Sequence, residues 1–119
     1  MPYMTRDFDP SLLPRFLDRL PVGVTVIDHG CRILYYNEFC ADKLGRTPES
    51  LGRDIRLCHR KPESIARIDE MIEAFEKGRR ESFQYDANPY GDPLAITLTP
   101  LLRDGRLVGY LHTVILKQP

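Results

Sequence analysis

Apolar positions near the start of the chain follow first a helical and then a strand-like spacing. Asp9-Pro10-Ser11 can begin a helix, and apolar side chains then recur at helical spacing, at Leu12, Leu13, Phe16, Leu17 and Leu20. Residues 22–27 alternate with β-branched side chains, which is typical of a strand, and residues 32–36 have the pattern of its antiparallel partner. Gly30-Cys31 between these strands predicts a type II′ turn.

Two further helices are predicted in the middle of the chain. Asn37 stands at an N-cap position before residues 38–44, and Gly45 stands where that helix should end. A loop is expected over residues 53–60. Pro62 then opens the longest helix, which ends at Gly78. Its apolar stripe consists of Ile65, Ile68, Ile72 and Phe75, with Met71 alongside.

The last third of the chain predicts three strands, at residues 80–87, 94–102 and 106–116. Asp104-Gly105 joins the last two strands in a tight hairpin, and the Pro- and Gly-rich segment 88–93 joins the first two. Two strands, then helices, then three hairpin-linked strands do not fit a doubly wound parallel sheet. The order predicts an α+β fold with a five-stranded antiparallel sheet and helices on one face, in which the last strand pairs with the first.

Composition narrows the class of protein. The 119 residues fit one domain, and 17 basic residues balance 17 acidic ones without a basic stripe, which argues against nucleic-acid binding. No window approaches the length of a membrane span, so a soluble, cytoplasmic protein is expected. Cys31, Cys40 and Cys58 follow no disulfide or zinc spacing, and no catalytic motif is present, so no enzyme is expected.

Several short motifs occur in an informative order. The hairpin of residues 26–36 is followed by Asn37, by Leu44-Gly45 and by Thr47-Pro48-Glu49, and residues 99–110 form a closing hairpin. In this order and spacing they resemble the PAS domain family, over nearly the whole chain. Two details differ from the common pattern: the usual Asp-Gly turn is here Gly30-Cys31, and the segment from Glu49 to Gly52 is one residue shorter.

The resemblance implies a PAS domain over residues 21–119, preceded by an amphipathic helix over residues 1–20 that serves as a cap or a dimerisation element. It implies a bacterial sensory module for signal transduction, with a homodimer and an output domain or partner protein. Because the chain ends in Lys117-Gln118-Pro119 where the family often continues into a signalling helix, two alternatives stay open. In the first, the protein is a free-standing PAS unit; in the second, an output domain has been cut away.

A cysteine and a histidine before the long helix are the candidate chemistry. Residues 51–60 resemble those of a bacterial PAS subgroup that carries a Cys-His-Pro motif, with Arg60 in place of the proline. The resemblance implies that the long helix and this loop wall a ligand pocket against the sheet. The candidate pocket residues are His59, Cys58, Ile65, Ile68, Met71, Ile72 and Phe75.

One hypothesis makes His59 an axial ligand of haem iron, with Cys58 or Met71 as the sixth ligand. In the alternative, His59 bonds a nearby carbonyl and the apolar residues form an ordinary core. His29 is expected in a solvated turn, and His112 is a weaker second ligand candidate. The functional expectation is a PAS sensor that binds a small ligand, with haem as a candidate, or else a ligand-free module for homodimerisation or protein–protein interaction.

Overall fold

The computed structural model describes residues 5–59, 61–88 and 91–117. Three features of the sequence analysis fall partly outside the described residues. They are the Cys-His motif at Arg60, the loop at Pro89-Tyr90 and the C-terminal Gln118-Pro119. The strands are β1 (Val22–Asp28), β2 (Ile33–Tyr36), β3 (Phe83–Ala87), β4 (Leu94–Arg103) and β5 (Arg106–Leu116). The helices are α1 (Leu13–Leu17), α2 (Glu38–Leu44) and α3 (Pro62–Glu76), with short 3₁₀ turns at Pro10–Leu12, Pro48–Ser50 and Ile55–Cys58.

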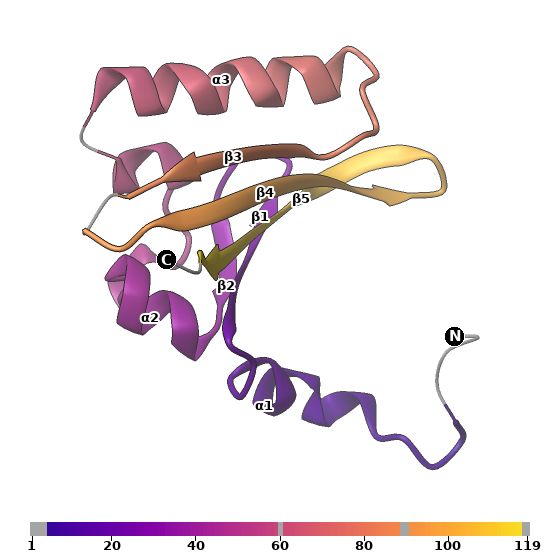
Figure 1. Ribbon diagram of the computed structural model, residues 1–119. Helices are drawn as coiled ribbons and strands as arrows, with labels where there is room; N and C mark the ends of the chain where they lie inside the picture. Colours follow the sequence, from indigo (N-terminus) through magenta and orange to yellow (C-terminus); the bar gives the residue numbers. More distant parts are fainter. Residues whose placement is uncertain (1–4, 60, 89–90, 118–119) are drawn as a thin grey trace.

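The strands form one antiparallel sheet in the order β2-β1-β5-β4-β3 (Figure 1). The last strand therefore lies beside the first, and the predicted five-stranded α+β fold is confirmed. Asp104 and Gly105 join β4 to β5 with φ angles of +52° and +77°. Both are left-handed, as a type I′ hairpin turn requires.

The turn between β1 and β2 differs from the predicted type II′ turn. Cys31 has a φ of +69°, whereas Gly30 has a negative φ. The N–H of Cys31 donates to the Asp28 carbonyl, and the N–H of Asp28 donates to the Arg32 carbonyl, so the loop contains three residues. A three-residue hairpin loop closes with a left-handed third residue, and this position falls on Cys31 rather than on a glycine.

Two predicted elements are shorter in the structure. The N-terminal helix ends at Leu17 instead of Leu20, because Asn37 Nδ2 donates to the Leu17 carbonyl and thereby ties the end of α1 to the sheet. The third strand begins at Phe83 instead of residue 80. The side chain of Arg79 there donates to the carbonyls of Glu81 and Ser82, which holds the segment as a turn.

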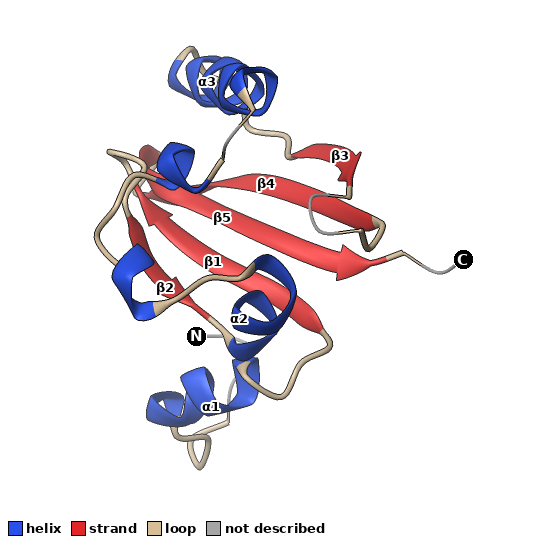
Figure 2. Cartoon of the chain, turned by 90° about the vertical axis from the view of Figure 1, so that its left-hand side faces the viewer, coloured by secondary structure: helices blue, strands red, loops and turns tan. Residues whose placement is uncertain are grey.

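Helices α2 and α3 both cover the same face of the sheet, whereas α1 lies beyond the end of the sheet where β1 begins (Figures 1 and 2). Alternation along β5 turns Tyr110, His112 and Val114 toward the covered face, where all three are buried. Phe75 of α3 packs its ring 5.6 Å from that of Tyr110 and 5.2 Å from that of Phe83. The main core therefore lies between α3 and the middle of the sheet.

Candidate functional site

His112 lies at the middle of the covered sheet face. Thr25 of β1 and Leu98 of β4 are directly opposite it in the two neighbouring strands, so the three side chains share this face. His112 is only 5% exposed, and its Nδ1 has no hydrogen-bond partner among the described residues. An unpaired buried polar atom costs about 1–3 kcal/mol. The stability of the fold therefore gives no reason for a histidine here.

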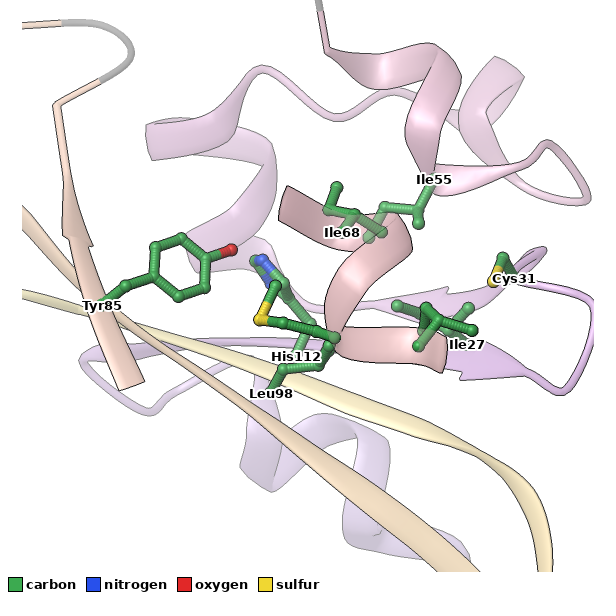
Figure 3. Close-up of a pocket in the computed structure, with 9 residues that line it drawn as sticks. Ile27, Cys31, Ile55, Ile68, Tyr85, Leu98 and His112 are labelled. Atoms are coloured by element: carbon green, nitrogen blue, oxygen red, sulfur yellow. The ribbon is translucent and has the colours of Figure 1, made fainter. Parts of the chain in front are cut away.

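A small cavity lies beside His112, between the sheet and α3. Its volume is about 10 Å³, which is room for about one water molecule. Figure 3 shows the Tyr85 hydroxyl pointing toward the His112 ring at one end, and Ile27 and Cys31 at the opposite end. The cavity is lined by Ile27, Cys31, Ile55, Ile68, Met71, Ile72, Tyr85, Leu98 and His112. Apolar atoms make up almost all of the cavity lining, and Tyr85 and His112 are the residues in it that carry polar ring or hydroxyl groups.

Arg46 places a positive charge near His112, although it does not line the cavity. It follows α2 and is only 7% exposed, and its Nε donates to Thr25 Oγ1 at 3.1 Å. Thr25 is paired with His112 in the sheet, so this hydrogen bond holds the Arg46 guanidinium near His112. Among the described residues, no carboxylate lies within ion-pair distance of Arg46. A buried cation without an acidic partner is costly in a folded protein.

His59 approaches the same region from the loop before α3. It caps the 3₁₀ turn Ile55–Cys58, and its side chain is half-buried. Its Nε2 is buried and has no hydrogen-bond partner within the part of the chain that the structure describes. Of His112, His59 and Arg46, only His112 lines the cavity.

Burial and the charge of Arg46 set the protonation of this group. Burial, helped by Arg46 and His59, lowers the pKa of His112 to about 3. Burial and Arg46 also lower the pKa of His59. Burial raises the pKa of Tyr85, an effect that Arg67 and Arg46 oppose. At neutral pH both imidazoles are therefore neutral, and Arg46 carries the local charge.

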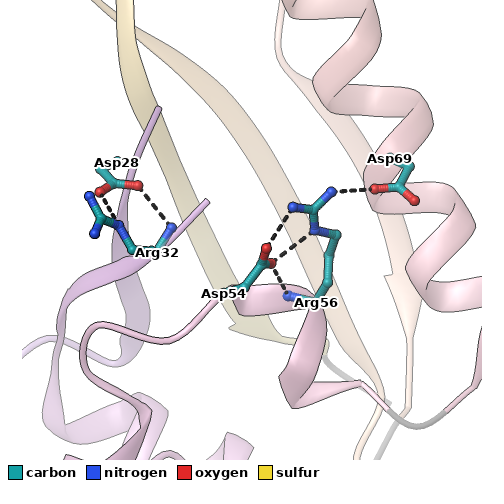
Figure 4. Close-up of polar contacts among 5 residues, drawn as sticks. All are labelled: Asp28, Arg32, Asp54, Arg56 and Asp69. Carbon is teal, nitrogen blue, oxygen red and sulfur yellow. Dashed lines mark hydrogen bonds and ion pairs between the residues drawn. The ribbon is translucent and has the colours of Figure 1, made fainter. Parts of the chain in front are cut away.

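The loop that carries His59 is tied to α3 by an ion-pair network (Figure 4). The N–H of Arg56 donates to Asp54 at the start of the 3₁₀ turn, and the Arg56 guanidinium also donates to Asp54. The same guanidinium reaches Asp69 of α3 at 2.8 Å. Because Arg56 holds both carboxylates, it fixes the position of the His59 loop against the helix.

The structure places the predicted pocket residues in different positions. Ile68, Met71 and Ile72 line the cavity. Phe75 is fully buried in the aromatic core beside it, and Cys58 packs against that core while half-buried. Ile65 is half-buried and does not line the cavity. The exposed His29 lies in the β1–β2 turn.

Sequence reasoning gave little weight to His112 and missed Tyr85, Arg46 and Thr25. The signal for His112 was present, because Tyr110 and Val114 flank it at strand spacing, and an apolar or aromatic pair at i±2 indicates an inward position. Arg46 carried no such signal. It follows a helix-terminating glycine, where an exposed side chain is the common outcome.

The residues present do not fit haem in this conformation. A cavity of about 10 Å³ is far smaller than the several hundred Å³ of a typical cofactor pocket. Arg46 also opposes a cation at the histidine nitrogens, since it is buried beside them without an acidic partner in the described ranges. No cluster of three or more His, Cys, Asp or Glu side chains able to hold a metal ion occurs among the described residues.

The fold is shared with solved structures of other proteins. The C-terminal domain of a protein from Streptococcus mutans superimposes with a TM-score of 0.75 at 22% identity, over 95% of this chain and 92% of that one. The PAS domain of Bordetella pertussis BvgS gives 0.71 at 20% identity, over 92% and 86%. A sensory box sensor histidine kinase from Vibrio cholerae gives 0.65 at 18% identity, over 92% of each chain. No curated protein matches the chain.

The sequence itself matches the model of one family. The PAS domain model matches residues 13–115, which span most of the chain. The protein belongs to the PAS domain family, as its motifs indicated. No helix within residues 5–59, 61–88 and 91–117 has the length and apolar character needed to cross a membrane.

Proposed function

We propose that the protein is the sensory module of a signalling system and that it binds a small ligand between the sheet and α3. The supporting observation is the cavity next to His112, whose Nδ1 is buried and unpaired among the described residues. A polar group that the fold leaves unsatisfied is suited to a ligand that completes its hydrogen bonds. The module itself catalyses no reaction, and an output domain or partner protein receives the signal. Several solved structures of similar fold come from sensor histidine kinases, which agrees with this role.

A route from the pocket to α1 follows from the contacts of β1. Thr25 lies opposite His112, which lines the pocket, and the neighbouring Val24 donates its N–H to Asn37 Oδ1 at 2.9 Å. Asn37 Nδ2 donates to the carbonyls of Leu17 and Val22. A ligand that shifts β1 would therefore shift the end of α1 as well, and the exposed side of α1 would carry the signal to a partner.

A pair of substitutions in α3 tests the pocket. Met71 lines the cavity, whereas Phe75 is fully buried and packs against two aromatic rings. We expect Met71→Ala to cost about 2 kcal/mol in unfolding free energy, at the low end of the range for core truncation, because it borders space that is already empty. Phe75→Ala is the matched control and should cost about 3–5 kcal/mol.

Urea unfolding of the ligand-free protein measures both values. A Met71→Ala cost near 5 kcal/mol, equal to that of Phe75→Ala, would contradict a ligand pocket at this place. It would favour the second candidate function, a module with a closed core that acts only through protein–protein contacts. The small cavity volume is the observation that supports this second candidate.

We also propose that the protein forms a homodimer through α1. Leu13, Phe16 and Leu20 are 43–45% exposed, so an apolar surface on this segment lacks a covering within the described chain. Deleting residues 1–20 should convert a dimer into a monomer or an aggregate in light scattering. A full-length chain that stays monomeric at high concentration would refute the dimer.

Haem binding at His59 stays a prediction of the sequence, and a ligand smaller than haem suits the cavity better. Visible absorption decides between them. A Soret band in protein from haem-replete cells, abolished by His59→Ala, would establish haem. Absence of that band after the protein has been incubated with haem would rule out haem as the cofactor.

A further inference from the structure

The sheet ends at β2 on one side and at β3 on the other (Figure 2). On β3 the exposed side chains are Gln84 and Asp86, and Asp86 pairs with Lys117 at 2.8 Å. Natural proteins use such polar and charged side chains to keep a sheet edge from pairing with another chain. On β2 the exposed side chain is Leu34, which is 58% exposed. The β2 edge therefore lacks the protection that the β3 edge has.

The chain itself pairs with the first part of the β2 edge. The N–H of Ile33 donates to the Arg53 carbonyl at 2.9 Å, and the N–H of Gly52 donates to the Ile33 carbonyl at 2.8 Å. Within the described ranges, no backbone hydrogen bond from a segment other than β1 reaches residues 34–36. The outer edge of β2 is thus able to pair, and its second half is open.

An open groove of about 540 Å³ lies along this second half. Leu34, Tyr35 and Tyr36 line it from the strand, and Leu51, which is 48% exposed, lines it from the loop that leads to Gly52. The volume lies within the range of about 300–1,000 Å³ that binding sites occupy. Leucine and tyrosine side chains give the groove an apolar floor beside an unpaired strand edge.

Two carboxylates complete the groove. Asp18 follows α1 and Glu38 begins α2, and Asp18 Oδ1 accepts a hydrogen bond from the N–H of Glu38 at 2.9 Å. Neither carboxylate has a basic side chain within ion-pair distance in the part of the chain that the structure describes. Arg15 and Arg19 are close to Asp18 in sequence but do not line the groove. The charge of the lining therefore favours a cationic occupant.

We propose that the groove binds an extended basic segment of a partner protein, which adds to the sheet as a strand beside residues 34–36. Its backbone pairs with the open half of β2, as residues 52–53 pair with Ile33. Its Arg or Lys side chains face Asp18 and Glu38, and its apolar side chains contact Leu34. The groove shares no lining residue with the cavity beside His112, so this interface goes beyond the proposed ligand pocket.

Three synthetic peptides test the charge and the strand pairing. The first alternates arginine and valine over six residues, because successive side chains of a strand point to opposite faces. The second has glutamate in place of each arginine. The third keeps the arginines and carries a methyl group on every backbone nitrogen, which removes the N–H donors. In fluorescence anisotropy with the full chain, the first peptide should give a dissociation constant at least 10-fold lower than either of the others.

Substitutions in the groove test its residues. Asp18→Asn combined with Glu38→Gln removes both charges and keeps an acceptor for the backbone N–H of residue 38. This double variant should lose the preference for the first peptide over the second. Glu63→Gln combined with Glu70→Gln, at exposed positions in α3, is the matched control with the same change of charge and should retain the preference. Leu34→Ser should weaken binding of the first peptide several-fold.

Each comparison has a result that overturns the proposal. Equal affinity for the first and second peptides would overturn the cationic occupant, and equal affinity for the first and third would overturn the strand pairing. Absence of binding by the first peptide would overturn the partner segment as a whole. A dimer of the full chain that Leu34→Ser dissociates would in that case identify a second copy as the occupant instead.

Discussion

His112 should make the protein lose stability as the pH falls from neutral. Its ordinary pKa of 6.5 in the unfolded chain falls to about 3 in the folded protein, because the ring is buried beside Arg46. Between these two values the unfolded state binds a proton that the folded state does not bind, so unfolding free energy rises with pH, by up to about 1.4 kcal/mol per pH unit. From pH 7 down to pH 5 the loss due to His112 alone is about 2 kcal/mol.

The comparison of wild type with His112→Leu isolates this loss. Urea unfolding at pH 7 and pH 5 gives the change in unfolding free energy for each protein, with ligand absent. The change should be about 2 kcal/mol smaller in His112→Leu, because leucine does not titrate. The residual change in that variant includes the contribution of His59, whose pKa is also lowered by burial and by Arg46.

A control separates this effect from a general effect of removing a histidine. His29 lies exposed in the turn between β1 and β2, so His29→Ala should leave the difference between pH 7 and pH 5 as in the wild type. Equal pH dependence in wild type and His112→Leu would refute the reasoning, because it would show that His112 takes up a proton as readily in the folded as in the unfolded chain.

Two backbone-level predictions follow from single contacts. Asn37→Ala should lower the unfolding free energy in urea by about 3 kcal/mol, because the amide bridges β1 and α1 and its loss leaves the N–H of Val24 unpaired. The control Asn88→Ala, at an exposed position, should change the unfolding free energy by less than about 0.5 kcal/mol. Gly109→Ala should lower the unfolding free energy by about 3 kcal/mol, because a Cβ there would lie 2.3 Å from the Ile27 carbonyl oxygen. In the control Gly30→Ala the nearest atom to the new Cβ is 3.5 Å away, so the loss should be less than about 1 kcal/mol. A Gly109→Ala protein as stable as wild type would show that β1 and β5 can move apart freely.

Most of the fold could be predicted from local patterns. Period-2 alternation in β1 and β5, the stripe of α3, Asn37 before α2 and Asp104-Gly105 each act within a few residues, so a single sequence is enough to locate them. One error arose where a distant contact decides, because the end of α1 depends on a hydrogen bond from Asn37, twenty residues away. The start of β3 depends instead on side-chain bonds of Arg79 to Glu81 and Ser82, which are local but have no signature in the strand pattern.

The site was predictable only in part. The apolar wall of α3 follows from helical spacing, and Ile68, Met71 and Ile72 do line the cavity. The polar groups near His112 come from β5, from Arg46 shortly after α2 and from the loop before α3, so they are distant in sequence. Only the strand register, which sets His112 opposite Thr25, brings Arg46 to the same place.

The most direct test of a ligand between the sheet and α3 is mass spectrometry of the full chain, purified natively from the cells that make it. Under non-denaturing conditions we predict a mass that exceeds the chain by one small molecule, which is released on denaturation and is retained less by Met71→Ala than by the wild type. The chain mass alone under both conditions would contradict the account.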